Sequence, residues 1–264
     1  MLTIKDVSLT FNEDTPDEKK ALQGINLELK EGEFVTVIGS NGAGKSTLMN
    51  IISGNLVPDV GDVQIGGKTV TNLPEYKRSA YVGRVFQDPM AGTAPSMTIE
   101  ENLAMAYSRT RKRTLTRGVT KQRKVEFRDH LGSLNLGLED RLNAKVGLLS
   151  GGERQALSLL MATFTRPNIL LLDEHTAALD PSRAALITKL TKEVVAEHGL
   201  TTLMVTHNMQ QALDLGTRLI MMDKGQIILD IDESKKQGLA IEDLLKEFQR
   251  IRGEQFESDR AVLG

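Results

Sequence analysis

The sequence predicts an α/β fold in which a mostly parallel core sheet carries an antiparallel N-terminal β subdomain and an inserted α-helical subdomain. Three observations lead to this prediction. Two runs near the N-terminus alternate apolar and polar residues, as strands with one solvated face do. Short, wholly apolar runs elsewhere alternate with helical patterns, which is typical of a buried parallel sheet. A polar, helix-prone segment from about Met97 to Leu149 interrupts this alternation.

The composition is that of a soluble globular protein with one sizeable core. The chain has 264 residues, of which 40% are hydrophobic and 26% are charged. Its net charge of −2 argues against a nucleic-acid partner, since such proteins present strongly basic surfaces. The absence of cysteine excludes a disulfide framework and fits a reducing cytosol. The N-terminus has no signal-peptide pattern, and no apolar run reaches the roughly 20 residues of a membrane span. Any role at a membrane is therefore expected to depend on a partner protein.

The N-terminal subdomain is predicted from alternating runs. Apolar side chains recur at every second or third position across residues 2–11, and they alternate again across residues 25–29. The polar residues 12–20, which include a proline, read as the loop between these two strands. Residues 34–38 then form a short apolar run of the kind that is buried in a parallel sheet.

The middle of the chain is predicted to return to the sheet and then leave it. A glycine-rich loop opens a helix that ends near Gly54, and residues 63–70 read as a strand or hairpin. Residues 81–86 form a strand that ends at Gln87. The helix-prone segment that follows is predicted to be an inserted helical subdomain over about residues 97–160.

The rest of the chain alternates strands and helices. These elements are predicted at residues 169–172, 181–198, 202–205, 209–215 and 219–222. This βαβ order implies a parallel sheet with helices on both faces. The Asp223-Lys224-Gly225 turn predicts a final hairpin. We therefore expect one domain over residues 1–230 and a charged helical tail over residues 231–264.

The strongest local motif is a phosphate-binding loop that follows a strand and opens a helix. It comprises Gly39, Ser40, Asn41, Gly42, Ala43, Gly44, Lys45, Ser46 and Thr47. Glycines let several backbone N–H groups converge on phosphate oxygens, and the helix N-terminus adds a positive dipole end. Lys45 is expected to reach the β- and γ-phosphates, and the Ser46 hydroxyl to bind Mg²⁺. The motif predicts a P-loop NTPase, because a chance glycine-rich turn would lack the flanking strand and helix.

Two adjacent carboxylates end a buried strand. Asp173 and Glu174 follow the apolar residues 169–172, at the edge where open α/β sheets bind ligands. Asp173 is expected to hold Mg²⁺ or its water shell, and Glu174 to polarise the water that attacks the γ-phosphate. Two solvated acids at a strand end would be the ordinary alternative. Their combination with the phosphate-binding loop favours the catalytic interpretation.

A second helix start carries a capping signal and two glycines. Ser150 is expected to be the N-cap, with Glu153 three residues later completing a capping box. Gly151 and Gly152 leave the backbone N–H groups of this helix N-terminus accessible. The helix start is therefore predicted to be a second anion site, well separated in sequence from the first.

In the order of these motifs the chain resembles the ATP-binding cassette family over about residues 1–230. Phe11 stands where the family places an aromatic residue against adenine, and Gln87 matches the family's glutamine loop. Asp180 matches the short loop after the acidic pair, and His207 matches the switch histidine. Together with the three motifs above, these matches in the family's order leave little room for coincidence.

The resemblance implies a mechanism that needs two chains and the cofactors ATP and Mg²⁺. A homodimer forms head to tail when ATP binds, and each ATP lies between one chain's loop and the partner's Ser150, Gly151 and Gly152. Gln87 would contact Mg²⁺, and Asp180 would lie at the dimer interface. His207 would hold the γ-phosphate and orient Glu174.

The sequence departs from the family's common pattern in two places. His175 stands where most members carry proline or another small residue, and Phe11 where tyrosine is frequent. Neither position belongs to the hydrolytic set. His175 is expected to be either a solvated loop residue or an interface residue beside Asp180.

The resemblance also implies a transport role. The ATPase subunit would lie on the inner face of the cell membrane, bound to a transmembrane permease and served indirectly by a substrate-binding protein. Import of a small solute such as an amino acid is the favoured interpretation, with an exporter or a soluble iron–sulfur assembly ATPase as alternatives. The basic residues 109–124 are either a solvated surface or a patch that faces anionic headgroups.

Overall fold

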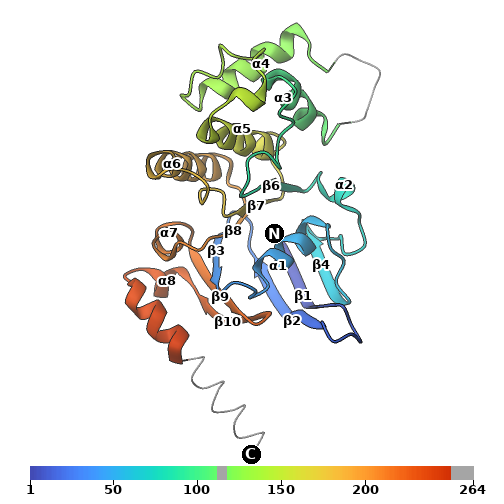
Figure 1. Ribbon diagram of the computed structural model, residues 1–264, viewed down its shortest axis with the longest axis vertical. Coiled ribbons are helices and arrows are strands. Elements are labelled where there is room, and N and C mark those ends of the chain that lie inside the picture. The colour runs from blue at the N-terminus through green and yellow to red at the C-terminus, as the bar shows by residue number, and fades with distance from the viewer. Residues whose placement is uncertain (112–117, 251–264) are drawn as a thin grey trace, which may run out of the picture.

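A computed structural model describes residues 1–111 and 118–250 and contains two β-sheets. An N-terminal sheet has the strand order β2-β1-β4-β5, and a core sheet has the order β10-β9-β3-β8-β7-β6 (Figure 1). The strands are β1 (Leu2–Phe11), β2 (Lys19–Leu29), β3 (Phe34–Gly39), β4 (Val60–Ile65), β5 (Lys68–Thr69), β6 (Val82–Val85), β7 (Ile169–Asp173), β8 (Thr202–Val205), β9 (Arg218–Asp223) and β10 (Gln226–Ile231).

The pairing pattern confirms the predicted fold class. Every neighbouring pair in the N-terminal sheet is antiparallel, and every pair in the core sheet is parallel except β9 with β10. The helices are α1 (Lys45–Ser53), α2 (Glu75–Arg78), α3 (Ile99–Ser108), α4 (Lys121–Gly132), α5 (Gly151–Thr163), α6 (Pro181–His198), α7 (Met209–Asp214) and α8 (Glu233–Lys236), with a 3₁₀ turn at Val146–Leu148.

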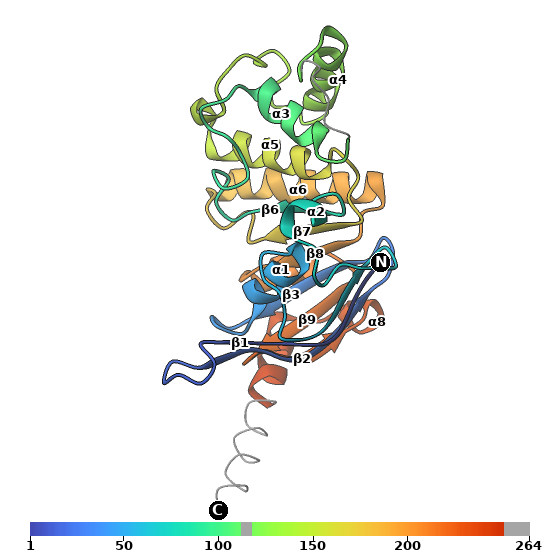
Figure 2. The same ribbon diagram turned by 90° about the vertical axis from the view of Figure 1, so that its right-hand side faces the viewer.

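Successive side chains of the core strands enter two different hydrophobic clusters. Ile169 and Leu171 of β7 pack with α1 and the N-terminal sheet, whereas Leu170 and Leu172 pack with α5 and α6. This is the alternation expected of a strand that is buried on both faces. One face of the core sheet is therefore covered by α1 and the N-terminal sheet, and the other by helices (Figure 1, Figure 2).

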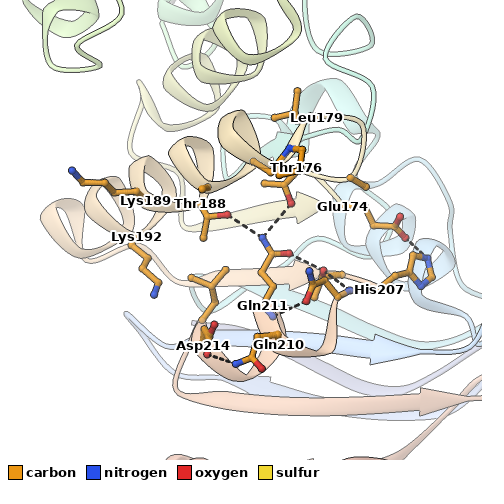
Figure 3. Close-up of a pocket in the computed structure, with 17 residues that line it drawn as sticks. Glu174, Thr176, Leu179, Thr188, Lys189, Lys192, His207, Gln210, Gln211 and Asp214 are labelled. Atoms are coloured by element: carbon orange, nitrogen blue, oxygen red, sulfur yellow. Dashed lines mark hydrogen bonds and ion pairs between the residues drawn. The ribbon is translucent and has the colours of Figure 1, made fainter. Parts of the chain in front are cut away.

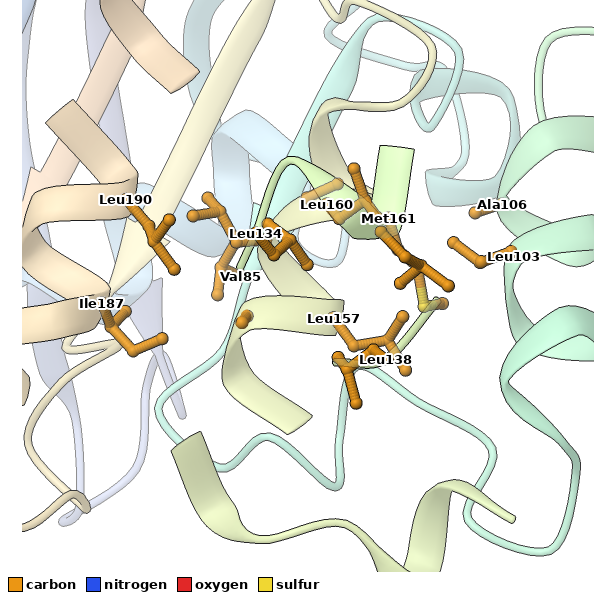
Figure 4. Packing of buried hydrophobic residues seen from close by; sticks show 14 of the residues in the cluster. Val85, Leu103, Ala106, Leu134, Leu138, Leu157, Leu160, Met161, Ile187 and Leu190 are labelled. Atoms are coloured by element: carbon orange, nitrogen blue, oxygen red, sulfur yellow. The ribbon is translucent and has the colours of Figure 1, made fainter. Parts of the chain in front are cut away.

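The inserted helices build their own part of the core beyond α5. Phe127 of α4 packs edge-on against Tyr107 and Phe164, with ring centroids 6.1 and 5.8 Å apart. Figure 4 shows Leu157, Leu160 and Met161 of α5 between the labelled side chains of α3, Leu103 and Ala106, and those of α6, Ile187 and Leu190. Helix α5 is thus shared by the helical subdomain and the core sheet.

The C-terminal elements follow from turn and cap chemistry. Lys224 and Gly225 both have positive φ angles, of 45° and 78°, which is the geometry of the predicted two-residue hairpin between β9 and β10. Asp232 caps α8, and residues 241–250 are helical. Part of the basic stretch 109–124 and the end of the predicted tail, residues 112–117 and 251–264, lie outside the described residues.

A buried arginine closes the end of α1. Arg78 is fully buried and donates to the carbonyls of Ile51, Ile52, Thr71 and Leu73. Cations at a helix C-terminus satisfy carbonyl groups that have no partner within the helix. The guanidinium therefore anchors the end of α1 to the segment that precedes β6.

Neither expectation for His175 is correct. Its side chain is only 2% exposed, and its Nε2 lies 3.0 Å from the Thr191 hydroxyl of α6. Burial lowers the pKa of His175 to about 4. The residue is a neutral core side chain that packs the loop after Glu174 against α6, because α6 folds back over that loop.

The burial of His175 predicts acid sensitivity. The unfolded chain binds a proton at this residue below its ordinary pKa of 6.5, whereas the folded chain does so only near 4. The contribution of His175 to the free energy of unfolding is therefore fully present above its pKa in the unfolded chain. It falls as the pH drops, by about 2 kcal/mol at about pH 5. His175→Gln keeps an N–H donor toward Thr191 but cannot titrate. We expect urea unfolding to show that the free energy of unfolding falls between neutral pH and about pH 5 by about 2 kcal/mol less in His175→Gln than in wild type.

A matched control is available at the surface. His130 is exposed, so His130→Gln is expected to keep the wild-type pH dependence. An unchanged pH dependence in His175→Gln would contradict the prediction.

Candidate active site

The parallel register brings four strand ends to one edge of the core sheet. Asp173 of β7 and Val37 of β3 both lie opposite Val205 of β8, and Val85 of β6 lies opposite Leu172. The residues that follow these positions leave the sheet at about the same level. They include four of the predicted site residues, Gly39, Gln87, Glu174 and His207.

The phosphate-binding loop can be built only with glycine at its two ends. A Cβ on Gly39 would lie 2.2 Å from the Met222 carbonyl oxygen, and one on Gly44 would lie 2.6 Å from that of Ala21. Gly44 also has a φ of 100° and is the N-cap of α1. The loop therefore wraps closely around the start of α1, with backbone N–H groups at a helix N-terminus.

Lys45 is held inside this loop. Its side chain is 5% exposed, and its Nζ donates to the carbonyls of Gly39 and Ser40 at 2.8 and 2.9 Å. Burial lowers the pKa of Lys45, and the nearby Glu174 and Asp173 carboxylates oppose that change. The ammonium is thus directed at the centre of the loop, where an anion can accept its hydrogen bonds.

The loop borders a cavity of about 300 Å³. Loop residues from Asn41 to Thr47 form one wall, and Phe11, Lys19 and Ala21 of the N-terminal sheet form another. Glu174 and His207 close the cavity at the edge of the core sheet. The structure therefore brings together five segments that lie as far apart in sequence as residues 11 and 207.

Glu174 and His207 form a direct pair. Glu174 Oε1 lies 2.6 Å from His207 Nε2, and the two side chains are 15% and 47% exposed. Glu174 has a φ of 46°, in the left-handed region that non-glycine residues rarely adopt. This backbone turn directs the carboxylate out of the strand line toward the cavity, where it can accept a proton from a bound water.

A glutamine that the sequence analysis missed fixes the position of the loop around His207. Gln211 Oε1 accepts from the Thr206 hydroxyl at 2.8 Å, and its Nε2 donates to Thr176 and Thr188 at 3.1 and 3.2 Å. Figure 3 shows this network joining α6, α7 and the two loops beside the Glu174–His207 pair, along a cavity of about 970 Å³. A lone glutamine on a short helix carries no sequence signal for this role.

Asp173 pairs with an arginine that the sequence analysis also missed. Arg84 of β6 donates to Asp173 Oδ2 at 2.9 Å, and the two side chains are 12% and 17% exposed. Within the described ranges, no group of three or more acidic, histidine or cysteine side chains could hold a metal ion. Mg²⁺ suits such a site, because it binds one or two protein oxygens and completes its shell with phosphates and water. Of the two predicted oxygen ligands, Ser46 lines the 300 Å³ cavity, whereas Asp173 is not among its described lining residues but lies close enough to affect the pKa of Lys45.

The second predicted anion site forms a separate helix start. Ser150 caps α5 and exchanges hydrogen bonds with Glu153, which confirms the predicted capping box. A Cβ on Gly152 would lie 3.0 Å from the Arg183 side chain. Ser150, Gly151 and Gly152 are not among the described residues that line the 300 Å³ cavity. The two predicted anion sites are therefore separate within one copy of the described chain.

Gln87 and Asp180 also lie outside the lining of that cavity in the part of the chain that the structure describes. Gln87 is exposed at the end of β6. Asp180 is the N-cap of α6 and accepts from Ser182 at 2.6 Å and from the Arg183 backbone at 3.1 Å. Neither residue contacts the nucleotide-sized cavity within a single copy of the described chain.

Comparisons with known proteins agree with this geometry. The family described as ABC transporter matches residues 22–177. A tyrosine transport ATP-binding protein of Clostridioides difficile is 44% identical over 94% of this chain and 99% of its own. A xylose/arabinose import ATP-binding protein of Sulfolobus acidocaldarius is 36% identical, with 92% of each chain covered. A dimeric ATP-binding cassette, solved in a post-hydrolysis state with ADP and Pi, has a TM-score of 0.75 at 30% identity, over 88% of this chain and 99% of that one.

Proposed function

The chain belongs to the ATP-binding cassette transporter family, and we propose that it is the ATPase subunit of a bacterial importer for a small solute. It is an ATP-hydrolysing cassette of that family. The observation that carries the proposal is the cavity in which Lys45, Glu174 and His207 meet at the N-terminus of α1. That arrangement combines phosphate binding with a positioned base.

The loop half of the site binds and neutralises the phosphates. Backbone N–H groups at the start of α1 and the Lys45 ammonium surround the phosphate oxygens. Ser46 and Asp173 would hold Mg²⁺, which would supply positive charge to the phosphates when it is bound. Phe11, half-exposed on the cavity wall, offers a ring face for adenine.

Glu174 is proposed to polarise the attacking water. Its carboxylate lies at the cavity edge and is oriented by the 2.6 Å contact with His207. The Gln211 network fixes the loop that carries His207. In this proposal His207 holds the γ-phosphate and Glu174 together, and Gln87 approaches the metal from the neighbouring strand end.

A second copy is proposed to complete each site. The phosphate loop leaves the cavity open, and the helix N-terminus at Ser150, Gly151 and Gly152 lies elsewhere in the same chain. Head-to-tail pairing would bring that N-terminus of one copy to the γ-phosphate held by the other, with Asp180 near the interface. The dimeric arrangement of a structurally similar cassette supports this pairing.

Import, with an amino acid as the cargo to test first, is supported by the relatives. The Clostridioides difficile protein that is similar over nearly the whole of both chains is described as a tyrosine transport ATP-binding protein. Import proteins for sugars and for methionine are more distant. Purification of the chain with its permease and a substrate-binding protein, followed by tyrosine binding to the latter, would test the proposal.

A permease is proposed to bind in a cleft beside β6. This cleft encloses about 320 Å³ and lies between the core sheet, α3 and α5, with Ala91, Gly92, Met161 and two arginines in its wall. None of the described helices is both long and apolar enough to span a bilayer. Docking in this cleft would place the subunit at the inner face of the membrane.

The phosphate loop predicts a strict need for Lys45. Lys45→Ala is expected to reduce ATP turnover by on the order of 100-fold or more, because it removes the cation that stabilises the β- and γ-phosphates. Lys30→Ala changes an exposed lysine outside the site and is expected to leave Mg²⁺-dependent phosphate release unchanged. Wild-type turnover by a folded Lys45→Ala protein would contradict the assignment.

The separation of the two half-sites predicts ATP-driven dimerisation. Glu174→Gln is expected to slow hydrolysis by roughly 10²- to 10⁴-fold and to accumulate a dimer in Mg-ATP. Adding Ser150→Arg should abolish that dimer, since it puts bulk at the second phosphate site. Light scattering measures the dimer in both proteins. Ser133→Arg, at an exposed helix end, is the control for the added arginine. A monomeric Glu174→Gln protein in saturating Mg-ATP would count against head-to-tail pairing.

The cleft predicts where the permease docks. Because the chain lacks cysteine, single cysteines at Thr93 and Met97, which follow the cleft residues Ala91 and Gly92, are expected to cross-link to the permease. A cysteine at Glu31, in the exposed turn that precedes β3 at the amino ends of the core strands, should form no adduct. If the first two positions fail to cross-link in a transporter that still hydrolyses ATP, the permease docks elsewhere.

A further inference from the structure

Arg84 is the only arginine that contacts Asp173 in the described part of the chain. It lies on the edge strand β6, next to β7, which ends with Asp173. The two side chains are 12% and 17% exposed, so this ion pair is largely shielded from water. A shielded pair is screened less by salt than a surface pair, and its geometry is correspondingly better defined.

The guanidinium is fixed from three sides. Besides its contact with Asp173, it donates to Asn50 Oδ1 at 2.8 Å and to the Ser53 hydroxyl at 3.3 Å, both on α1. Its central carbon lies 4.7 Å from the centre of the Phe86 ring, which completes the support. Arginine suits this position, because its planar fork donates in several directions at once, whereas lysine acts as a point charge.

Arg84 also forms part of the wall of the 320 Å³ cleft. The same cavity is lined by Ser53, Phe86 and Arg109. Arg84 Nε is buried and has no hydrogen-bond partner among the described residues. One side chain therefore both contacts the Asp173 carboxylate and lines the cleft.

We propose that Arg84 is a positioning residue that sets the Asp173 carboxylate for its metal and makes it responsive to what occupies the cleft. This inference rests on the proposed function, in which Asp173 binds Mg²⁺ and the cleft receives the permease. Residues that orient a metal ligand typically change metal affinity by about 10- to 100-fold when they are replaced. Arg84 acts only through Asp173 and is not expected to touch the nucleotide.

The test measures metal binding separately from activity. Mn²⁺, which electron paramagnetic resonance detects directly, is titrated into the ATP-bound chain, and ATP affinity is measured in EDTA. Arg84→Met is expected to weaken Mn²⁺ binding by about 10- to 100-fold while ATP affinity in EDTA changes less than about twofold. Arg84→Lys should give an intermediate loss of Mn²⁺ affinity, since one ammonium cannot replace all the contacts of the guanidinium.

Arg218 provides the matched control. It is a partly buried arginine that pairs with Asp230 and Glu33, and it is not among the described residues that line the cleft or the 300 Å³ cavity. Arg218→Met is expected to leave Mn²⁺ affinity unchanged. Wild-type Mn²⁺ affinity in Arg84→Met would overturn the inference, and if that variant does not fold, wild-type affinity in Arg84→Lys would do so.

Two further measurements separate this inference from the function on which it rests. Asp173→Asn should weaken Mn²⁺ binding at least as much as Arg84→Met, and an Asp173→Asn protein with normal affinity would overturn the proposed metal site itself. In the assembled transporter, the permease is expected to change Mn²⁺ affinity for wild type and Arg218→Met but not for Arg84→Met. An equal change in all three proteins would overturn the link between the cleft and Asp173.

Discussion

The parallel pairing of β3, β8 and β7 determines where the phosphate loop, Glu174 and His207 stand. In parallel strands all carboxyl ends meet at one edge, and a shift of one residue in register would move each end residue out of line. Here Val37 and Asp173 lie at the level of Val205. The phosphate loop, Glu174 and the loop to His207 consequently leave the sheet side by side, although more than 160 residues separate the first from the last. The hydrophobic layers on both faces stabilise this register rather than the site directly.

Charge balance is the second requirement of the site. Asp173 and Glu174 are adjacent and mostly shielded, so their mutual repulsion needs compensation. Arg84 pairs with Asp173, His207 lies against Glu174, and Lys45 is close enough for both carboxylates to affect its pKa. A nucleotide with its metal would enter a site whose charges already have partners. This is the condition under which electrostatic stabilisation needs little reorganisation.

The parts of the structure that the sequence predicts are those with local causes. The phosphate loop, the Ser150 capping box and the turn at Lys224 each depend on residues within a few positions of one another. Long-range packing explains what was missed. His175 becomes a core residue because Thr191 on α6 folds over it, and Arg84 meets Asp173 across 89 positions of sequence. A residue type alone does not say which distant partner the topology brings to it, so the same reasoning could propose hydrolytic residues but not the side chains that hold them.

Helix α5 joins the two surfaces that the proposed function assigns to partners. Its first turn, at Ser150, is the half-site for a second copy, and Ser158 and Met161 near its other end line the cleft proposed for the permease. With a rise of 1.5 Å per residue, these points lie roughly 12 to 17 Å apart along one rod. A packed helix moves as a unit, since its side chains interdigitate with α6 on one side and the inserted helices on the other. A shift of the cleft wall would therefore also shift the helix start that faces the partner's phosphate. Arg84 lines the same cleft and contacts Asp173. A change in the cleft wall would therefore reach both the phosphate-loop side of the site and the Ser150 helix start.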